Sequence, residues 1–274
     1  MAKILIVGYG YIGKPLAKLL ASNDNEVWAI SRSNAEHIEG VHHIKEDLFQ
    51  IETLPPVDAV IYLVSADSHS EQDYVKAYVD GPKHIWSLFK DKKPYRFLFA
   101  SSTAVYPFND GRWADEDSEL PDATEFNGHI LQHAEKHVLN FDCHSICMRI
   151  GGIYGPNRHH LVNQLREGTF HPTDHPVYSN RIHQYDCVHA IAHIMDHLAP
   201  ETIYNLVDHA PTPINEIIAW IQATLGFHSP IPSKTLTPKQ YTTNKRVNNQ
   251  KLLLLRYQFK YPSYREGLSE IFSK

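Results

Sequence analysis

The sequence predicts an α/β fold in which a doubly wound, mostly parallel sheet is followed by a smaller C-terminal lobe. Three observations lead to this prediction. Short apolar runs alternate with helical patterns, a glycine-rich turn directly follows the first run, and prolines become frequent after Gly155-Pro156. We therefore expect a first domain over residues 1–154 and a lobe over 155–274, partly interleaved with it.

The apolar runs have the length and composition of strands that are buried on both faces. Strands that alternate with helices indicate parallel βαβ units. The predicted strands are 3–7, 26–30, 59–64, 96–100 and 145–150, and the predicted helices are 14–21, 74–89, 128–140, 188–198 and 214–225.

The turn after the first strand has the pattern G-x-G-x-x-G, from Gly8 through Gly10, Tyr11 and Ile12 to Gly13. In such a turn one glycine makes the bend, one lets the backbone approach a pyrophosphate, and one lets helix and strand pack closely. The N-terminus of the following helix would face the phosphates. The strand–turn–helix context predicts a Rossmann-type domain that binds a nicotinamide dinucleotide, and a glycine-rich turn without a ligand is the alternative.

The end of the second strand bears on the choice of dinucleotide. An NAD site usually has an acidic side chain about 20 residues past the glycines, where it binds the ribose 2′-hydroxyl. This chain has Ser31, Arg32 and Ser33 there. An arginine with two hydroxyls suits a 2′-phosphate, which favours NADP over NAD. The alternative is that Arg32 is an ordinary surface residue.

Further segments resemble the NAD-dependent epimerase/dehydratase family of the extended short-chain dehydrogenase/reductase superfamily, over nearly the whole chain. Asp47-Leu48 is similar to the family's adenine-contacting pair, and Val64-Ser65-Ala66 to a segment that lines the cofactor. The other similar segments are 78–81, 101–106, 149–158, 181–188 and 204–206. The resemblance implies an NAD(P)-binding protein whose substrate is a nucleotide-sugar or a similar small polar compound.

The family's catalytic pair is missing. Aligning Glu135 with the glutamate of the family's Tyr-x-x-x-Lys helix places Asn127 at the tyrosine position and Leu131 at the lysine position. Asn127 cannot exchange a proton at neutral pH, and Leu131 cannot bind ribose. Ser102 matches the family's serine and is the remaining catalytic candidate. The chain thus resembles the atypical members that keep the fold without the dyad.

Two interpretations follow from this departure. The first is an enzyme, an oxidoreductase, epimerase or dehydratase, in which His129, His133 or a tyrosine replaces the missing acid/base. The second is a non-catalytic sensor of NADP(H) or a regulator of a partner. By resemblance, the residues expected to bind substrate are Tyr106, Tyr154, Arg158, Arg181 and His183, with either arginine holding phosphates.

A metal-dependent protein is a third interpretation, because two histidine ladders follow helical spacing. They are 129, 133, 137 and 189, 193, 197, and the simpler explanation is a solvated face in a chain with 19 histidines. A net charge of −5 does not suggest a nucleic-acid partner. No apolar run nears the ~20 residues of a membrane span. The lack of a signal peptide and the three unpaired-looking cysteines favour the cytoplasm. We expect a monomer or homodimer.

Overall fold

The computed structural model describes residues 1–34, 36–90, 92–158, 160–167, 169–170, 172–197, 200–226 and 242–272. The chain forms two compact units, which are considered separately. Unit 1 comprises residues 1–105, 122–149 and 188–204, and unit 2 comprises 106–121, 150–187 and 205–274. Both units join distant stretches of chain, so a single cut near residue 155 does not separate them.

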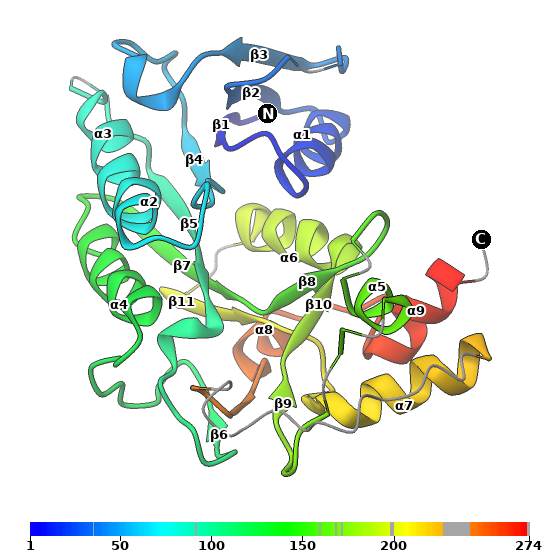
Figure 1. Ribbon diagram of the computed structural model, residues 1–274. Helices are drawn as coiled ribbons and strands as arrows, with labels where there is room; N and C mark the ends of the chain where they lie inside the picture. The colour runs from blue at the N-terminus through cyan, green and yellow to red at the C-terminus, as the bar shows by residue number, and fades with distance from the viewer. Residues whose placement is uncertain are drawn as a thin grey trace. The chain divides into compact units, whose positions relative to one another are not determined.

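A seven-stranded sheet has the strand order β11-β7-β5-β4-β1-β2-β3 (Figure 1). Its strands are β1 (Lys3–Val7), β2 (Glu26–Ser31), β3 (Val41–Lys45), β4 (Ala59–Tyr62), β5 (Arg96–Ser102), β7 (His144–Ile150) and β11 (Ile203–Leu206). The pairs that join β3, β2, β1, β4 and β5 are parallel. Chain order runs outward in both directions from β1 and β4, which is the topological switch point of a doubly wound sheet. The predicted fold class is confirmed.

Helices of unit 1 cover this sheet on both faces. Figure 1 shows α4 (Phe126–Val138) with the segment 71–87 on one face and α1 (Gly13–Ser22) on the other. The strands β1, β4, β5 and β7 are almost entirely buried on both faces, as the continuous apolar runs predict. The helix α6 (Gln184–Asp196) begins four residues earlier than predicted. Leu198, the last residue of the predicted helix 188–198, lies outside the described residues.

The segment predicted as one helix over 74–89 is divided into three parts. They are α2 (Glu71–Tyr74), the π-helix η2 (Val75–Asp80) and α3 (Gly81–Ser87). The fully buried Tyr62 hydroxyl donates a hydrogen bond to the Ala77 carbonyl at 2.6 Å. A Cβ atom at Gly81 would lie 2.0 Å from the same hydroxyl. The wider turn therefore gives a buried hydroxyl both an acceptor and space, which apolar periodicity could not reveal.

Unit 2 is built from short elements around its own core. Its strand pairs are β6 (Trp113–Ala114) with β13 (Arg246–Val247), β8 (Gly152–Tyr154) with β10 (Arg181–His183), and β9 (Tyr178–Ser179) with β12 (Thr212–Pro213). Its helices are α5 (His160–Arg166), α7 (Ile214–Leu225), α8 (Gln250–Leu254) and α9 (Tyr264–Phe272). Apolar side chains of α5, α7 and α9 pack with Tyr154 in one cluster. No helix in the described parts of either unit is long and apolar enough to cross a membrane.

Candidate functional site

The three glycines of the turn from β1 into α1 have different steric surroundings. Gly8 has φ +106°, and a Cβ atom there would lie 2.8 Å from the Leu63 carbonyl carbon. A Cβ atom at Gly13 would lie 2.0 Å from the Gly8 carbonyl oxygen. At Gly10, by contrast, nothing lies within 4 Å of the added atom. Gly8 and Gly13 are therefore required by the fold, whereas Gly10 leaves space above the turn.

A cavity of about 480 Å³ opens beside this turn. Its walls come from the carboxyl ends of β1, β2, β3 and β4, and from the π-helix η2. The lining residues that the sequence predicts are Gly8, Gly10, Ser31, Arg32, Ser33, Asp47, Leu48, Val64 and Ser65. Ligands of open α/β sheets bind at this edge, next to the switch point.

Four residues predicted to contact the cofactor do not line this cavity. They are Tyr11, Ile12, Gly13 and Ala66, of which Ile12 and Gly13 are buried beneath the turn. The cavity also has charged lining residues that the sequence analysis missed, among them Lys14, Glu36, Asp67, Asp73 and Lys76. Lys14 could have been found, because it opens the helix after the third glycine. Asp67 lines the cavity because the sheet order places the end of β4 near the end of β2, and Lys76 lines it because it lies on the π-helix η2. Neither arrangement can be predicted from the local sequence.

Arg32 makes a two-pronged ion pair at the cavity wall. Its Nη1 and Nη2 atoms lie 2.6 and 2.5 Å from the two carboxylate oxygens of Asp67. The hydrogen bonds to Arg32 lower the pKa of Asp67, and the same bonds raise the pKa of Arg32. Both side chains are more than half exposed, at 61% and 53%. A solvent-exposed pair of this kind contributes little to folding stability and can exchange partners.

Aromatic and hydroxyl groups lie beside this ion pair. The Ser31 hydroxyl lies 2.9 Å from His43 Nε2 and donates to the Ser33 carbonyl at 3.1 Å. The His43 ring lies 5.4 Å from the ring of Tyr9, which lines the cavity. The Tyr9 hydroxyl is buried without a hydrogen-bond partner among the described residues, and burial raises its pKa. Another predicted cofactor residue, Asp47, has a local role. Its side chain accepts a hydrogen bond from the Phe49 N–H and so caps the short 3₁₀ turn η1 (Leu48–Gln50).

The helix α4 carries Asn127 and Leu131, which the alignment through Glu135 places at the positions of the catalytic pair in the family that the sequence resembles. Asn127 is half-buried, and its side-chain oxygen accepts a hydrogen bond from the Gly128 N–H. Leu131 is only 2% exposed and packs into the protein. Ser102 accepts a bond from the Ala104 N–H at 3.2 Å, as a residue of a local turn does. None of these three side chains has the chemistry of a proton donor that a lysine activates.

Other residues of α4 hold the helix to the sheet. Glu135 makes a buried ion pair with Arg149 of β7, with a closest distance of 2.8 Å. Glu135 also accepts a bond from the Ser101 hydroxyl at 2.6 Å. The Gln132 side chain donates to the Val105 carbonyl and accepts from the Ala123 N–H. The polar residues buried on this helix are therefore used for packing and hydrogen bonding within unit 1.

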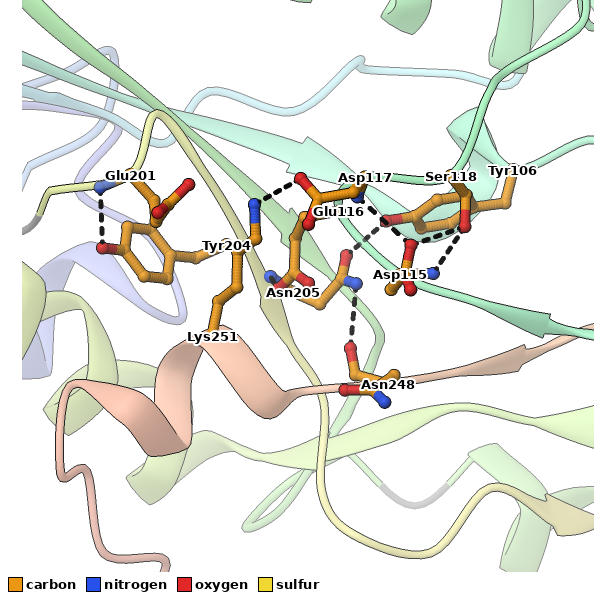
Figure 2. A network of polar contacts seen from close by, with 10 residues as sticks. All are labelled: Tyr106, Asp115, Glu116, Asp117, Ser118, Glu201, Tyr204, Asn205, Asn248 and Lys251. Atoms are coloured by element: carbon orange, nitrogen blue, oxygen red, sulfur yellow. Dashed lines mark hydrogen bonds and ion pairs between the residues drawn. The ribbon is translucent and has the colours of Figure 1, made fainter.

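In unit 2, Tyr106 is a core residue. Figure 2 shows its hydroxyl pointing at Asn205, to whose Oδ1 atom it donates at 2.8 Å. The Asn205 amide nitrogen donates to the Asn248 carbonyl, and the Asn205 backbone N–H donates to Glu116. Tyr106 is 0% exposed, and burial raises the pKa of Glu116. This placement argues against the expected contact of Tyr106 with substrate, because its polar group is already satisfied inside the protein.

The other residues expected to bind substrate also lie in unit 2. The parallel pairing of β8 and β10 sets Tyr154 beside His183, with ring centroids 5.2 Å apart. Both side chains are buried, and the Tyr154 hydroxyl donates to the Ser263 carbonyl. Arg181 opens β10 and is half-buried, whereas Arg158 is exposed.

Asp208 is a buried carboxyl that the sequence analysis missed. It is 2% exposed, and its Oδ2 atom has no hydrogen-bond partner among the described residues. Burial raises its pKa to about 8. Nothing in the spacing of the sequence marks this aspartate, because its burial depends on the packing of unit 2.

The first histidine ladder lies on α4, and the second lies on α6 except for His197, which directly follows that helix. His129 and His133 are exposed, and the rings of His193 and His197 stack with centroids 3.8 Å apart. Over the part of the chain that the structure describes, no three histidine, cysteine or acidic side chains form a group suited to a metal ion.

Known proteins share the fold of this chain, and the model of one family matches most of its length. The sequence profile of the NAD-dependent epimerase/dehydratase family matches residues 4–207. A Methylobacillus flagellatus protein assigned to the NAD-dependent epimerases/dehydratases has a TM-score of 0.80 and 28% identity, with 99% of this chain and 98% of that chain covered.

Two more distant structures share the fold. The human epimerase family protein SDR39U1, solved with NADPH, has a TM-score of 0.80 and 18% identity over 99% of each chain. UDP-glucuronic acid 4-epimerase from Bacillus cereus, solved with NAD, has a TM-score of 0.79 and 20% identity over 97% of this chain and 96% of that chain. With the profile match and the Rossmann-type sheet, these similarities show that the chain belongs to the NAD-dependent epimerase/dehydratase family.

Proposed function

We propose that the protein binds NADP(H) in the cavity at the carboxyl ends of β1 to β4. The observation that carries this proposal is the turn itself. Gly8 and Gly13 are fixed by backbone contacts, while Gly10 faces the cavity with open space in front of it. A volume of about 480 Å³ lies within the usual range for cofactor and ligand sites. The N-terminus of α1, which has no side-chain cap, suits a pyrophosphate.

The preference for NADP rests on the end of β2. Ser31, Arg32 and Ser33 all line the cavity there, so a 2′-phosphate would meet a guanidinium and two hydroxyls. Of the structural relatives, the human protein was solved with NADPH and the Bacillus cereus enzyme with NAD. The family therefore accommodates both dinucleotides, and the residues of this chain favour the phosphorylated one.

The test is a calorimetric titration of the purified protein with NADPH, NADH, NADP and NAD. We expect Gly10→Asp to weaken all binding by at least about 100-fold, because a carboxylate would occupy the pyrophosphate position without disturbing the fold. We expect Arg32→Ala to weaken NADPH about tenfold and NADH less than twofold. Failure of the wild-type protein to bind any dinucleotide would overturn the proposal.

The state of α4 favours a binding role, as a sensor of NADP(H) or a regulator of a partner, because Leu131 is buried where the family has its lysine. Membership of the family favours a second candidate, an oxidoreductase, epimerase or dehydratase with a non-standard acid/base. It would act on a nucleotide-sugar or a similar polar compound, whose phosphates Arg158 or Arg181 would hold. Analysis of the products formed from a panel of nucleotide-sugars, with nicotinamide absorbance added to detect net oxidation or reduction, separates the two, and turnover that Gly10→Asp abolishes would establish the enzyme.

A further inference from the structure

Arg32 is occupied by a carboxylate in the same cavity where a 2′-phosphate would need it. Asp67 follows β4 and takes both terminal nitrogens, Nη1 and Nη2, of the guanidinium. Both side chains line the cavity, so the ion pair forms part of its wall. The contact joins the ends of β2 and β4, which are separated in the sheet by β1.

A carboxylate and a phosphate recognise the same face of a guanidinium. Each uses two oxygens to accept parallel N–H bonds, and each is negatively charged. A phosphate that binds Arg32 in this way must displace at least one Asp67 oxygen, and it then lies close to the displaced charge. NAD has a hydroxyl at this position, carries no added charge there and leaves the ion pair intact.

From this geometry we infer that Asp67 is a specificity-determining residue, which opposes NADP by competing with its 2′-phosphate for Arg32. The inference rests on the proposed function, because it concerns a dinucleotide in this cavity. It deepens that function by dividing the choice of cofactor between two residues. Arg32 supplies attraction for the phosphate, and Asp67 limits how strongly the protein favours NADP over NAD.

Lys76 adds a second positive charge near Asp67 in the cavity wall. This lysine lies on the π-helix, lines the same cavity, and has its ammonium 5.2 Å from the centre of the Phe49 ring. The main cause of the lowered pKa of Asp67 is its hydrogen bonding to Arg32, and the positive charge of Lys76 lowers this pKa further. Asp67 therefore remains an anion when Arg32 turns to the phosphate, and its repulsion of that phosphate persists.

The experiment compares four proteins by titration with NADPH and NADH: wild type, Asp67→Asn, Arg32→Ala and the double variant. We expect Asp67→Asn to tighten NADPH about threefold to tenfold and to change NADH less than twofold. In the Arg32→Ala background the same substitution should tighten NADPH by a smaller factor than in the wild type, since no guanidinium remains to be released and only the repulsion between Asp67 and the phosphate is removed.

The matched control is Asp73→Asn. Asp73 lines the same cavity, but its carboxylate accepts a bond from Ser68 and lies outside the Arg32 pair. If Asp67→Asn weakens NADPH, leaves it unchanged, or acts no more strongly than Asp73→Asn, the inference is overturned while the proposed function stands. If neither wild type nor any variant binds a dinucleotide, the proposed function fails and this inference fails with it.

Discussion

The turn from β1 to α1 and the helix α4 lie in the same compact unit but keep the family's sequence pattern to different degrees. In the turn, all three glycines are present; backbone atoms crowd the Cβ positions of Gly8 and Gly13, whereas the Cβ position of Gly10 is open. On α4, the alignment through Glu135 places Asn127 at the position of the family's catalytic tyrosine and Leu131 at that of its lysine. Glu135, which belongs to the same family pattern, is still present.

The difference separates residues that the packing of the fold requires from residues that it does not require. Glu135 is tied to Arg149 and Ser101 inside the protein, so the fold needs it whether or not the protein is catalytic. Leu131 contributes apolar burial where a lysine would have to reach a cofactor. Gly10, by contrast, has no neighbour that would exclude a side chain, and so the fold does not require it. The proposed binding of a pyrophosphate at this turn would give Gly10 the role that the fold does not give it.

The largest expected effect concerns the buried ion pair of α4. Replacing Glu135 with alanine leaves Arg149 buried without its carboxylate, and we expect the free energy of unfolding to fall by about 3–5 kcal/mol. Urea denaturation followed by circular dichroism measures this change. The exposed neighbour Lys136→Ala is the control and should change stability by less than about 0.5 kcal/mol. A loss below about 1 kcal/mol for Glu135→Ala would contradict a structural role.

Restoring the family's dyad tests the other half of α4. Leu131→Lys places an ammonium at a site that is 2% exposed, so we expect destabilisation of about 2–3 kcal/mol. Asn127→Tyr should be tolerated within about 1 kcal/mol, because Asn127 is half-buried. The measurement is the urea midpoint of unfolding. A double variant with the same midpoint as the wild type would contradict the expected destabilisation, and if it also gained turnover it would show that α4 can still hold the dyad.

The glycines of the turn can be separated by the smallest possible side chain. Gly13→Ala forces a methyl group against the Gly8 carbonyl, and we expect a loss of about 1–3 kcal/mol in unfolding free energy. Gly10→Ala should cost less than about 0.5 kcal/mol, because nothing lies near its Cβ position. Thermal unfolding of both variants is the measurement, and equal losses would contradict the division of roles between the two glycines.

The smallest effect concerns the wall of the cavity. Tyr62→Phe removes the hydrogen bond to the Ala77 carbonyl in the π-helix, and we expect a loss of about 1 kcal/mol. Amide hydrogen exchange should accelerate over residues 75–80 and stay unchanged in α4. Unaltered exchange in that segment would mean that the π-helix does not depend on the hydroxyl.

Periodicity and motif spacing predicted those parts of the fold that local chemistry determines. Runs such as 3–7 and 96–100 became buried parallel strands because such strands need apolar side chains on both faces. The helix predicted over 74–89 is interrupted by a π-helical turn, because the hydroxyl of Tyr62 in β4 donates a hydrogen bond to the Ala77 carbonyl there. Likewise Tyr106 matches a family segment, but its partner Asn205 is 99 residues away, so its place in the core could not be predicted.

The sequence by itself determined the family, the glycine-rich turn after the first strand, the arginine after the second strand and the lack of a Tyr-x-x-x-Lys pattern between Ser102 and Arg149, because each depends on residues that are close together in the chain. Only the tertiary structure decided what these residues meet. The pairing of Arg32 with Asp67 exists because β2 and β4 flank β1 in one sheet. Leu131 is buried because α4 packs against that sheet. Contacts of this kind depend on strand order and helix packing, which bring together side chains that no local pattern connects.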